Sequence, residues 1–597
     1  MAEKITAGKA ALNVIESWGV KQIYGIPAGS LNGMMDAMYT AQDTIDFIQV
    51  RHEEVGSLAA AMQPKFSGNI GVVLGSGGPG ATHLMNGLYD AREDGVPVLA
   101  IIGTRPLHEI NLDGFQELNQ NPIYADVSDY NVRVAYPEQL PKIIDRAMRE
   151  AIGKGGVATV EVPVDFHWAE IDDDAWYSSA NGYRKPLAPR LNDKDIEEAT
   201  KLLNEAKRPV IYAGIGTRGH GKDVVDLADK LKAPVVVTGK NYDTFDFEYA
   251  GFMGSAGRVG WKPGNEILEE ADTILFAGSD YPFVESGGLF EGKKFIQIDI
   301  DPARIGKRRP VDAAILGDAG EAIREITEKV DDKPESAWYR ASLKNGKNWR
   351  EYMTALETKT EGDLQAYQIF NAINKHADED ATYSVDVGNV TQNSVRHLHL
   401  TPKNLWRTSP KFATMGSGLP GSIAAKLEFS DRQSWDLSGD GGFGMVMQDI
   451  VTMVQYNLSS IHIVFSNMIY GFIKREQEIS NKNPFFGVDF KSPVDFAKIA
   501  EAQGAVGYTI TSIHEIDEVF EKAIADEKAG KVVVIDAKIT NEQPIPVEYL
   551  VLDSKEHSEE DIKKYKDRFE AWNLKPFREF LEEEGLEPNV KHSRLSD

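Results

Sequence analysis

Short runs of apolar and largely β-branched residues recur along the chain, and most of them end at Gly, Asp or Asn before a helical pattern begins. Strands that are apolar on both faces and alternate with helices are typical of parallel sheets covered by helices on both sides. The pattern therefore predicts the α/β class, built from doubly wound parallel sheets. The predicted strands include Gly71–Leu74, Val98–Ile102, Val157–Val162, Val210–Ala213, Val235–Thr238, Ile274–Ala277, Phe295–Ile300, Ile461–Ser466 and Val532–Ile535.

Two polar stretches divide these strands into three groups. Residues 178–192 contain Pro186 and Pro189, and residues 331–362 are charged with weak strand character, so both are predicted as linkers. Each group of strands is long enough for a doubly wound domain of its own. We expect the first domain over residues 1–185, the second over 190–340, the third over 360–550 and a tail over 551–597.

The tail is highly charged but carries an apolar stripe, formed by Ile562, Tyr565, Phe569 and Trp572 at spacings of 3, 4 and 3. That spacing places the four side chains on one face of a helix. We expect a helical tail that packs on its own protein. The alternative is a helix on a membrane surface, which the mixed charges and the glutamates at 582–584 disfavour because anionic lipid would repel them.

Composition excludes several classes of protein. The 597 residues include 65 Lys and Arg against 92 Asp and Glu, a formal charge of −27, and no cysteine. The missing cysteines exclude disulfides, thiolate zinc and iron–sulfur sites and a thiol nucleophile. The negative charge argues against a nucleic acid partner, whose phosphates need a basic patch. We find neither a targeting pattern at the start nor an apolar run near the ~20 residues of a membrane helix, so a cytoplasmic protein is expected.

Two loops fit the pattern G-x-G-x-x-G, which begins many dinucleotide sites. They are Gly75, Gly77 and Gly80 in the first domain, and Gly214, Gly216 and Gly219 in the second. A nicotinamide site also needs an acid about 20 residues later, at the end of the next strand. Neither loop has that acid, so a conventional NAD site is excluded. A tight strand-to-helix turn with no ligand remains an alternative for both loops.

Small and acidic residues gather at the predicted strand ends of the second domain. An open α/β sheet binds nucleotides at the carboxyl ends of its strands. The pattern supports a dinucleotide in this domain without identifying it. The strand ends concerned are Gly278-Ser279-Asp280, Asp299-Ile300-Asp301 and Gly317-Asp318.

The third domain contains the clearest chemical motif. Gly439-Asp440-Gly441-Gly442 follows the run Gln433–Leu437, and Asn467 comes 25 residues later at the end of the strand Ile461–Ser466. Parallel strands bring their carboxyl ends to one edge, so Asp440 and Asn467 can converge there. Oxygen ligands at such a point suit Mg²⁺, which also binds phosphate oxygens. The glycines allow backbone N–H groups to approach those phosphates. Asp-Gly alone is a common turn, and the specificity comes from the combination with Asn467.

This combination resembles the metal motif of the thiamine diphosphate-dependent enzymes. The resemblance implies that Asp440, Asn467 and the backbone carbonyl of Ile469 hold Mg²⁺, which anchors thiamine diphosphate. Ser466 stands where family members usually have a first Asn. The family also predicts a glutamate after a strand of the first domain, and Glu53 fits; it would stabilise the protonated N1′ of the cofactor's pyrimidine. Alone, Glu53 reads as a helix N-terminal acid.

Longer segments are similar to the branch of this family that oxidises pyruvate with FAD, phosphate and O₂. They cover nearly the whole chain. They include Tyr24–Pro27, Gly75–Leu88, Phe115–Asn119, Phe295–Lys307, Phe412–Gly416 and Tyr470–Lys474.

That likeness implies further site residues. Met415 would be the apolar support under the thiamine, Phe115 the aromatic residue between thiamine and flavin, and Glu476 an acid near phosphate. His83 would line the pocket, although a histidine on a helix is more often structural. Arg475 is a departure that could alter phosphate affinity. The remaining implied contacts to thiamine diphosphate are Gly388, Gly439, Gly441, Gly442, Tyr470 and Gly471, and those to FAD are Gly214, Gly216, Lys240, Arg258, Ser279, Asp299 and Asp318.

The resemblance implies conversion of pyruvate, phosphate and O₂ to acetyl phosphate, CO₂ and hydrogen peroxide. In the family, the glutamate and the metal motif come from different subunits, so a homo-oligomer is implied, a tetramer built from dimers. The alternatives are an acetohydroxyacid synthase, which joins two 2-keto acids, a quinone-reducing, membrane-linked pyruvate oxidation, and a non-catalytic nucleotide-binding protein on the same fold.

Overall fold

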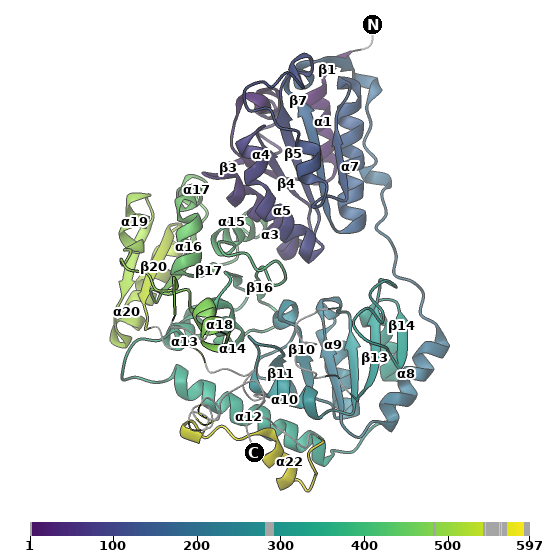
Figure 1. The fold of residues 1–597 in the computed structure, drawn as a ribbon, viewed down its shortest axis with the longest axis vertical. Coiled ribbons are helices and arrows are strands. Elements are labelled where there is room, and N and C mark those ends of the chain that lie inside the picture. The colour runs from purple at the N-terminus through teal and green to yellow at the C-terminus, as the bar shows by residue number, and fades with distance from the viewer. Residues whose placement is uncertain are drawn as a thin grey trace. The chain divides into compact units, whose positions relative to one another are not determined.

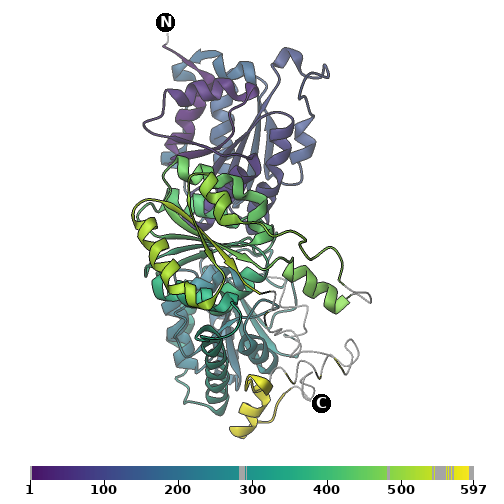
Figure 2. The same cartoon turned by 90° about the vertical axis from the view of Figure 1, so that its left-hand side faces the viewer.

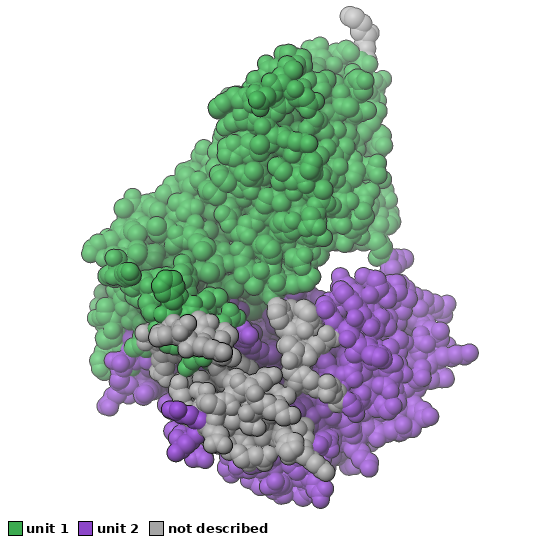
Figure 3. Space-filling model, viewed as in Figure 1, with its two compact units in different colours: residues 1–186, 380–390, 405–541 green, residues 187–379, 391–404, 542–597 purple. Residues whose placement is uncertain are grey.

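The computed structural model describes residues 3–280, 292–480, 485–540 and 570–589, and the single residues 290, 544, 560, 563 and 567. It contains three six-stranded sheets in which every paired strand is parallel, with helices between the strands (Figures 1 and 2). The predicted α/β class is thereby confirmed. The chain forms two compact units (Figure 3). Unit 1 comprises residues 1–186, 380–390 and 405–541, and unit 2 comprises residues 187–379, 391–404 and 542–597.

The first sheet of unit 1 has the strand order β3-β2-β4-β5-β7-β6. The strands of this sheet are β2 (Gln22–Gly25), β3 (Asp46–Gln49), β4 (Gly71–Gly75), β5 (Val98–Thr104), β6 (Tyr130–Arg133) and β7 (Val157–Pro163). The strands β1 (Lys4–Thr6) and β8 (Glu170–Asp172), which come before and after them in the sequence, form a separate antiparallel pair. The helices that accompany the sheet are α1 (Ala7–Ser17), α2 (Asn32–Tyr39), α3 (Glu53–Ser67), α4 (Pro79–His83), α5 (Met85–Asp94), α6 (Gln120–Tyr124) and α7 (Leu140–Lys154).

The central strand β5 shows why both faces are apolar. Its alternate residues Leu99 and Ile101 pack into one core with α1, α2 and α7. Val98 and Ala100 point to the other face, into a second core with α3 and α5. A strand buried on both sides needs an apolar residue at every position, which is the continuous pattern seen in the sequence.

The other sheet of unit 1 repeats the same topology, with the order β16-β15-β17-β18-β20-β19. Its helix α15 packs on α3 of the first sheet, and both contribute to a shared apolar core. Its strands are β15 (Thr382–Val385), β16 (Leu405–Arg407), β17 (Ser434–Gly439), β18 (Ser460–Ser466), β19 (Val506–Ile510) and β20 (Val532–Lys538). Its helices are α15 (Gly418–Glu428), α16 (Asp440–Val446), α17 (Ile450–Gln455), α18 (Gly471–Ser480), α19 (Phe496–Ala502) and α20 (Ile516–Lys528).

The sheet of unit 2 has the order β11-β10-β9-β12-β13-β14, that of a dinucleotide-binding fold. Its strands are β9 (Pro209–Ala213), β10 (Val235–Val237), β11 (Phe252–Ser255), β12 (Thr273–Ala277), β13 (Lys294–Asp299) and β14 (Ala313–Leu316). The helices of this part of the chain are α8 (Asp193–Glu205), α9 (Gly221–Leu231), α10 (Lys262–Glu270), α11 (Ala319–Lys329), α12 (Ala337–Glu357), α13 (Ala366–His376), α14 (Asn389–His397) and α22 (Phe577–Glu583).

Two segments differ from or refine the expected organisation. The charged stretch predicted as a linker over 331–362 contains α12, a helix of 21 residues that buries Trp338 and Trp349. The described part of the tail packs on its own unit: Trp572 meets Tyr352 of α12, and Phe577 of α22 meets Trp338. Of the predicted stripe, Ile562, Tyr565 and Phe569 lie outside the described residues. Within the described part of the chain, no helix has the length and apolar character needed to cross a membrane.

Candidate active site

The motif residue Asp440 lies where an open parallel sheet binds ligands. In the second sheet of unit 1, β15 and β17 are neighbours, and the strand order reverses between them. A crevice outside the carboxyl ends of the strands forms at such a switch point. Asp440 is the first residue of α16, directly after β17, and Gly388 follows β15 closely. The sheet topology therefore places both predicted residues at this edge.

The Asp440 carboxylate is held by backbone groups from two loops. Its Oδ1 accepts the N–H of Gly441 at 2.9 Å, and its Oδ2 accepts the N–H of Met468 at 2.7 Å. Met468 has a left-handed φ of +60°, unusual for a residue with a side chain, and this turn aims its N–H at Asp440. Burial raises the pKa of Asp440 to about 6, against the hydrogen bonds that lower it. A bound cation would stabilise the ionised form.

Asn467 and Ile469 flank Met468, whose N–H binds the Asp440 carboxylate. The side-chain oxygen of Asn467 accepts the N–H of Ile469 at 3.3 Å. Ile469 forms an antiparallel bridge with Asp489, in which the hydrogen bonds join the flanking residues rather than this pair. Both backbone groups of Ile469 are therefore turned away from Asp489. Within the described chain no cluster of three His, Asp or Glu could hold a metal, and the predicted set has one carboxylate, one amide and one carbonyl.

The glycines of the motif allow close packing around this group. A Cβ on Gly441 would lie 2.6 Å from the Tyr470 ring and 3.3 Å from the Met415 methyl carbon. A Cβ on Gly442 would overlap the carboxylate of Asp386. At Gly439 and Gly388 a Cβ would meet no atom within 4 Å. The structure thus brings Gly441, Tyr470 and Met415 together, and it leaves open space beside Gly439 and Gly388. Such a donor set with an adjoining cradle fits a metal-bound diphosphate.

Asp386 is a buried carboxyl at this edge that the sequence analysis did not identify. It follows β15 and accepts the N–H groups of Val387 at 2.7 Å and Ser417 at 3.2 Å. Burial raises its pKa to about 7. The signal that could have revealed it is an acid directly after a strand and two residues before a glycine, a pattern that Asp440 shares.

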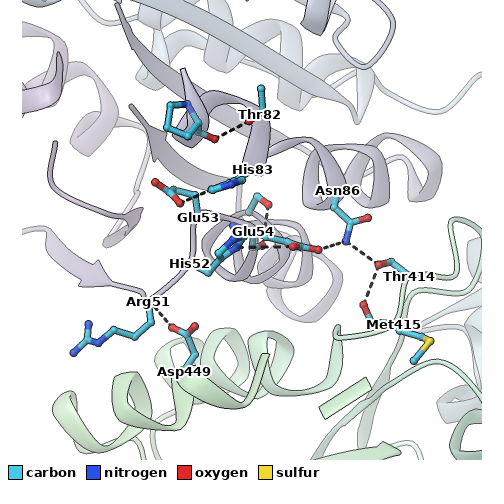
Figure 4. A network of polar contacts seen from close by, with 12 residues as sticks. Arg51, His52, Glu53, Glu54, Thr82, His83, Asn86, Thr414, Met415 and Asp449 are labelled. Atoms are coloured by element: carbon cyan, nitrogen blue, oxygen red, sulfur yellow. Dashed lines mark hydrogen bonds and ion pairs between the residues drawn. The ribbon is translucent and has the colours of Figure 1, made fainter. Parts of the chain in front are cut away.

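Glu53 and His83 form a side-chain contact between helices α3 and α4 of unit 1 (Figure 4). Glu53 is the first residue of α3, and its Oε2 lies 3.0 Å from Nδ1 of His83 at the end of α4. The Glu53 side chain is 13% exposed, and that of His83 is 41% exposed. The ring of His52 stacks on the His83 ring with centroids 4.4 Å apart. Glu53 is therefore a shielded carboxylate with a histidine partner, and His83 has a polar role beyond filling space.

In the first glycine loop, the local structure explains why Gly78 and Gly80 are glycines. Gly78 adopts a φ of +74°, and a Cβ on Gly80 would lie 3.0 Å from Oε1 of Glu53. The loop is a tight strand-to-helix turn that brings α4 close to the Glu53 carboxylate. This observation supports the turn interpretation of the Gly75–Gly80 pattern.

Phe115 stands on a loop that is held by a neighbouring carboxylate. Glu117 accepts the N–H groups of Asn111 and Gly114, the latter at 2.9 Å. These backbone hydrogen bonds lower the pKa of Glu117. Asn111, Asp113 and Gln116 all have left-handed φ values, of 69°, 57° and 59°. The loop is thus fixed in a rarely populated conformation that leaves the Phe115 side chain 77% exposed in the single chain.

The predicted residues after β18 lie on or just before one helix. Tyr470 precedes α18, and its ring packs edge-on against Phe490 at 4.6 Å. Gly471 begins α18, and Glu476 lies half-buried in that helix. Arg475 beside it is buried, with 4% exposure. The prediction of Glu476 as an acid near phosphate is not decided by these contacts.

All seven predicted FAD residues follow the carboxyl ends of the six parallel strands in unit 2. The pattern is strongest at β9 and β12, where the strand order reverses. The N–H of Gly216 donates to the carbonyl of Gly278 at 3.0 Å, and a Cβ on Gly214 would overlap the Ser279 side chain. The other four residues are Lys240 after β10, Arg258 after β11, Asp299 at the end of β13 and Asp318 after β14.

The acids in this set differ in their local roles. Asp299 is buried, its pKa is raised by that burial, and its Oδ1 accepts the N–H of Asp301 at 3.0 Å. Asp318 instead caps α11, accepting the N–H of Glu321 at 2.9 Å. The carbonyl of Lys240 accepts a hydrogen bond from Arg218, and that of Arg258 accepts one from Gln392 at 3.4 Å. Asp299 is thus the better placed of the two acids for a ligand.

Three family models match this chain. The N-terminal TPP binding domain of thiamine pyrophosphate enzymes matches residues 5–123, the central domain of these enzymes matches 196–326, and the C-terminal TPP binding domain matches 386–537.

Curated relatives match over most of their own length. A pyruvate oxidase from Lactiplantibacillus plantarum is 49% identical over 586 residues, which is 98% of this chain and 96% of the relative. A thiamine pyrophosphate-containing protein from Bacillus subtilis is 37% identical over 92% of this chain and 93% of its own. The large subunit of acetolactate synthase isozyme 1 from Escherichia coli is 29% identical over 84% and 89%.

Proposed function

The chain belongs to the family of thiamine pyrophosphate enzymes, and from that premise we propose that it oxidises pyruvate with phosphate and O₂ to acetyl phosphate, CO₂ and hydrogen peroxide. The observation that carries this proposal is the 49% identity, over nearly the whole chain, to a relative named pyruvate oxidase. The same substrates and cofactors are those that the family resemblance implies. A cytoplasmic location remains a prediction.

Asp440, Asn467 and the Ile469 carbonyl would hold Mg²⁺, and the metal would anchor the diphosphate of thiamine diphosphate. The support is the backbone-oriented Asp440 carboxylate and the hard oxygen donors beside it. The glycines Gly439, Gly441, Gly442, Gly388 and Gly471 would let the backbone approach the diphosphate, with Tyr470 packed against the motif. Met415 beside Gly441 would support the cofactor's rings.

Glu53 would share a proton with the pyrimidine ring. The support is its shielded position at the N-terminus of α3 and its single described side-chain partner, His83. His83 would orient the Glu53 carboxylate through the 3.0 Å contact. When bound, thiamine diphosphate supplies an electron sink for the loss of CO₂ from pyruvate, and FAD accepts two electrons that O₂ then removes. The residues of the chain would hold these groups, exclude water and place the proton.

FAD would lie along the carboxyl edge of the unit 2 sheet. One support is the strand order of that sheet. The other is that the predicted residues all lie at the carboxyl ends of its strands: Gly214, Gly216, Lys240, Arg258, Ser279, Asp299 and Asp318. Phe115 would stand between thiamine and flavin, and Glu476 would act near phosphate. Both assignments rest on resemblance.

A complete site would need a second copy of the chain, in a tetramer built from dimers. Among the described residues, no hydrogen bond or ion pair joins Glu53 to Asp440 or Asn467. The support for a partner subunit is the resemblance, in which the glutamate and the metal motif come from different subunits.

One assay separates this proposal from its alternatives. The purified holoprotein is given pyruvate, thiamine diphosphate, Mg²⁺, FAD and O₂, with and without phosphate, and peroxide, acetyl phosphate and acetolactate are measured. Peroxide and acetyl phosphate in equal amounts, dependent on phosphate, are expected. Acetolactate without peroxide would instead indicate a synthase, which the 29% identity to an acetolactate synthase keeps as the second candidate. Electrons passed to a quinone in place of O₂ would indicate the membrane-linked variant, and absence of all products a non-catalytic binding protein.

A further inference from the structure

One face of helix α5 holds the segment that leads to Met415. We call residues 409–414 the seated loop. The α5 face consists of Asn86, Tyr89, Asp90 and Glu93, which lie on one side of the helix at positions i, i+3, i+4 and i+7. Each of these four residues contacts a different residue of the seated loop.

Two of these contacts converge on Thr414, the residue before Met415. The side-chain amide of Asn86 donates to Oγ1 of Thr414 at 2.8 Å (Figure 4). The hydroxyl of Ser409 donates to Asp90 at 2.6 Å and accepts the backbone N–H of Thr414 at 3.1 Å. Thr414 Oγ1 in turn donates to the carbonyl of Met415 at 3.0 Å. Thr414 is therefore held through both its backbone and its side chain, and its hydroxyl in turn restrains the carbonyl of Met415.

The other two contacts fix the middle of the seated loop. The ring of Phe412 stacks on Tyr89 with centroids 5.7 Å apart and planes 17° apart. The ammonium of Lys411 lies 2.7 Å from the carboxylate of Glu93. Stacking and an ion pair at adjacent residues restrict the loop before it reaches Thr414.

The α5 face is itself anchored from helix α3. The amide of Asn86 also donates to Oε1 of Glu54 at 2.6 Å. Lys65 lies 2.7 Å from Asp90, and both side chains are almost fully buried. A buried charge pair is costly to break, so Asp90 has one well-defined position. The seated loop is thus anchored to α5, which is itself held by α3.

The backbone around Met415 needs such support. Ala413 has a φ of +58° and Gly416 a φ of +81°, so left-handed residues flank Thr414 and Met415. A left-handed conformation is unfavourable for Ala413, which has a Cβ, whereas Gly416 adopts it readily. The loop would relax to other conformations if its contacts were lost, and Met415 would move with it.

We infer that Thr414 and Asn86 are positioning residues that set Met415 under bound thiamine diphosphate. The inference rests on the proposed function, in which Met415 supports the cofactor. Loss of the Thr414 hydroxyl breaks the links to Asn86 and to the Met415 carbonyl together. The cofactor would then bind less tightly, and its C2 hydrogen would exchange more slowly because its two rings would no longer be held in the productive arrangement.

The test compares Thr414→Val, Thr414→Ser and Asn86→Ala with the wild type. Val keeps the shape of Thr without its hydroxyl, and Ser restores the hydroxyl. Binding of thiamine diphosphate to the apoprotein with Mg²⁺ is followed by fluorescence, and exchange of the C2 hydrogen for deuterium by NMR without pyruvate. We expect Thr414→Val and Asn86→Ala to raise the Kd about three- to tenfold and to slow exchange by at least as much, the effect of one hydrogen bond. Thr414→Ser should remain within about twofold of wild type.

Thr40→Val is the matched control, since the Thr40 hydroxyl also donates to a backbone carbonyl, that of Ala37 at 2.7 Å, in the same unit. It should leave both readouts unchanged. The inference is overturned if Thr414→Val matches the wild type, or if Thr40→Val loses as much. If the wild type itself binds no thiamine diphosphate, the proposed function fails instead. Asn86→Ala tests the inference where Thr414→Val does not fold.

Discussion

The carboxylate of Glu53 lies 3.0 Å from Nδ1 of His83, so the start of α3 and the end of α4 form one polar pair. Replacing Glu53 with Gln keeps the shape of the side chain but removes the carboxylate. We expect binding of thiamine diphosphate and FAD to stay within a few-fold of wild type, while turnover falls by roughly 10²- to 10⁴-fold, the usual contribution of a proton-transfer group.

The measurement is steady-state peroxide formation together with equilibrium binding of both cofactors. Glu150→Gln is the control, since Glu150 is a carboxylate of α7 in surface ion pairs with Arg146 and Lys154. Near-normal turnover of Glu53→Gln would refute the role assigned to Glu53.

Asp440 offers a test of the metal site. Asp440→Ala removes the proposed charged ligand and also the acceptor for the Met468 and Gly441 N–H groups. Affinity for Mg²⁺ and for thiamine diphosphate should fall together by at least about 100-fold, because in the proposed site the diphosphate binds through the metal. FAD content should be retained, because the proposed flavin residues belong to unit 2.

Titrating the variant apoprotein with thiamine diphosphate at several Mg²⁺ concentrations measures both affinities. Asp431→Ala, at an exposed loop position, is the comparison variant. Unchanged thiamine affinity in Asp440→Ala would show that Asp440 is not a ligand.

Glu117 tests whether the Phe115 loop is pre-organised. Glu117→Ala removes the acceptor for the Asn111 and Gly114 N–H groups, which holds three left-handed residues in place. We expect faster amide hydrogen exchange over residues 111–117 and a roughly ten- to hundredfold loss of turnover, since a misplaced group near the reacting atoms costs about that much. Cofactor binding should change little. Unaltered hydrogen exchange in this segment would contradict the role given to Glu117.

The fold and the placement of Asp440 and Asn467 at one sheet edge were predictable because their signals are local. The apolar runs of β4, β5 and β18 are continuous, since both faces of each strand are buried. Asn467 follows β18 and Asp440 follows the neighbouring strand β17, so a parallel sheet places them at one edge. Glu53 was predictable only through the family resemblance, because an acid at a helix start is also an ordinary capping feature.

Other features depend on contacts between distant segments. The α5 face is polar, and from sequence alone it reads as a solvated helix surface; its partners lie more than 300 residues later. Likewise α12 was taken for a linker because its charged residues mask the buried Trp338 and Trp349. Asp386 was missed because β15 before it reads Thr-Tyr-Ser-Val and lacks the apolar run by which strands were predicted; its partners Ser417 and Gly442 come later in the chain.

Asp449 predicts how stability depends on pH. Its Oδ1 accepts the N–H of Arg51 at 2.8 Å and the hydroxyl of Thr452 at 2.8 Å, and burial raises its pKa to about 6. In the unfolded chain an Asp has a pKa of about 3.9, so the folded state binds this proton more tightly. The stability contributed by the protonated form is fully present below about pH 4 and is lost as the pH rises through about 6.

Asp449→Asn removes the titrating group and keeps an oxygen acceptor for Arg51 and Thr452. We therefore expect the wild type to lose stability relative to this variant between pH 4.5 and 7, with a change in the difference of about 1–3 kcal/mol. Urea unfolding of both proteins at four pH values in that window measures the difference. Asp431→Asn, an exposed change, should run parallel to the wild type. A difference between Asp449→Asn and wild type that stays constant with pH would show that Asp449 is ionised throughout.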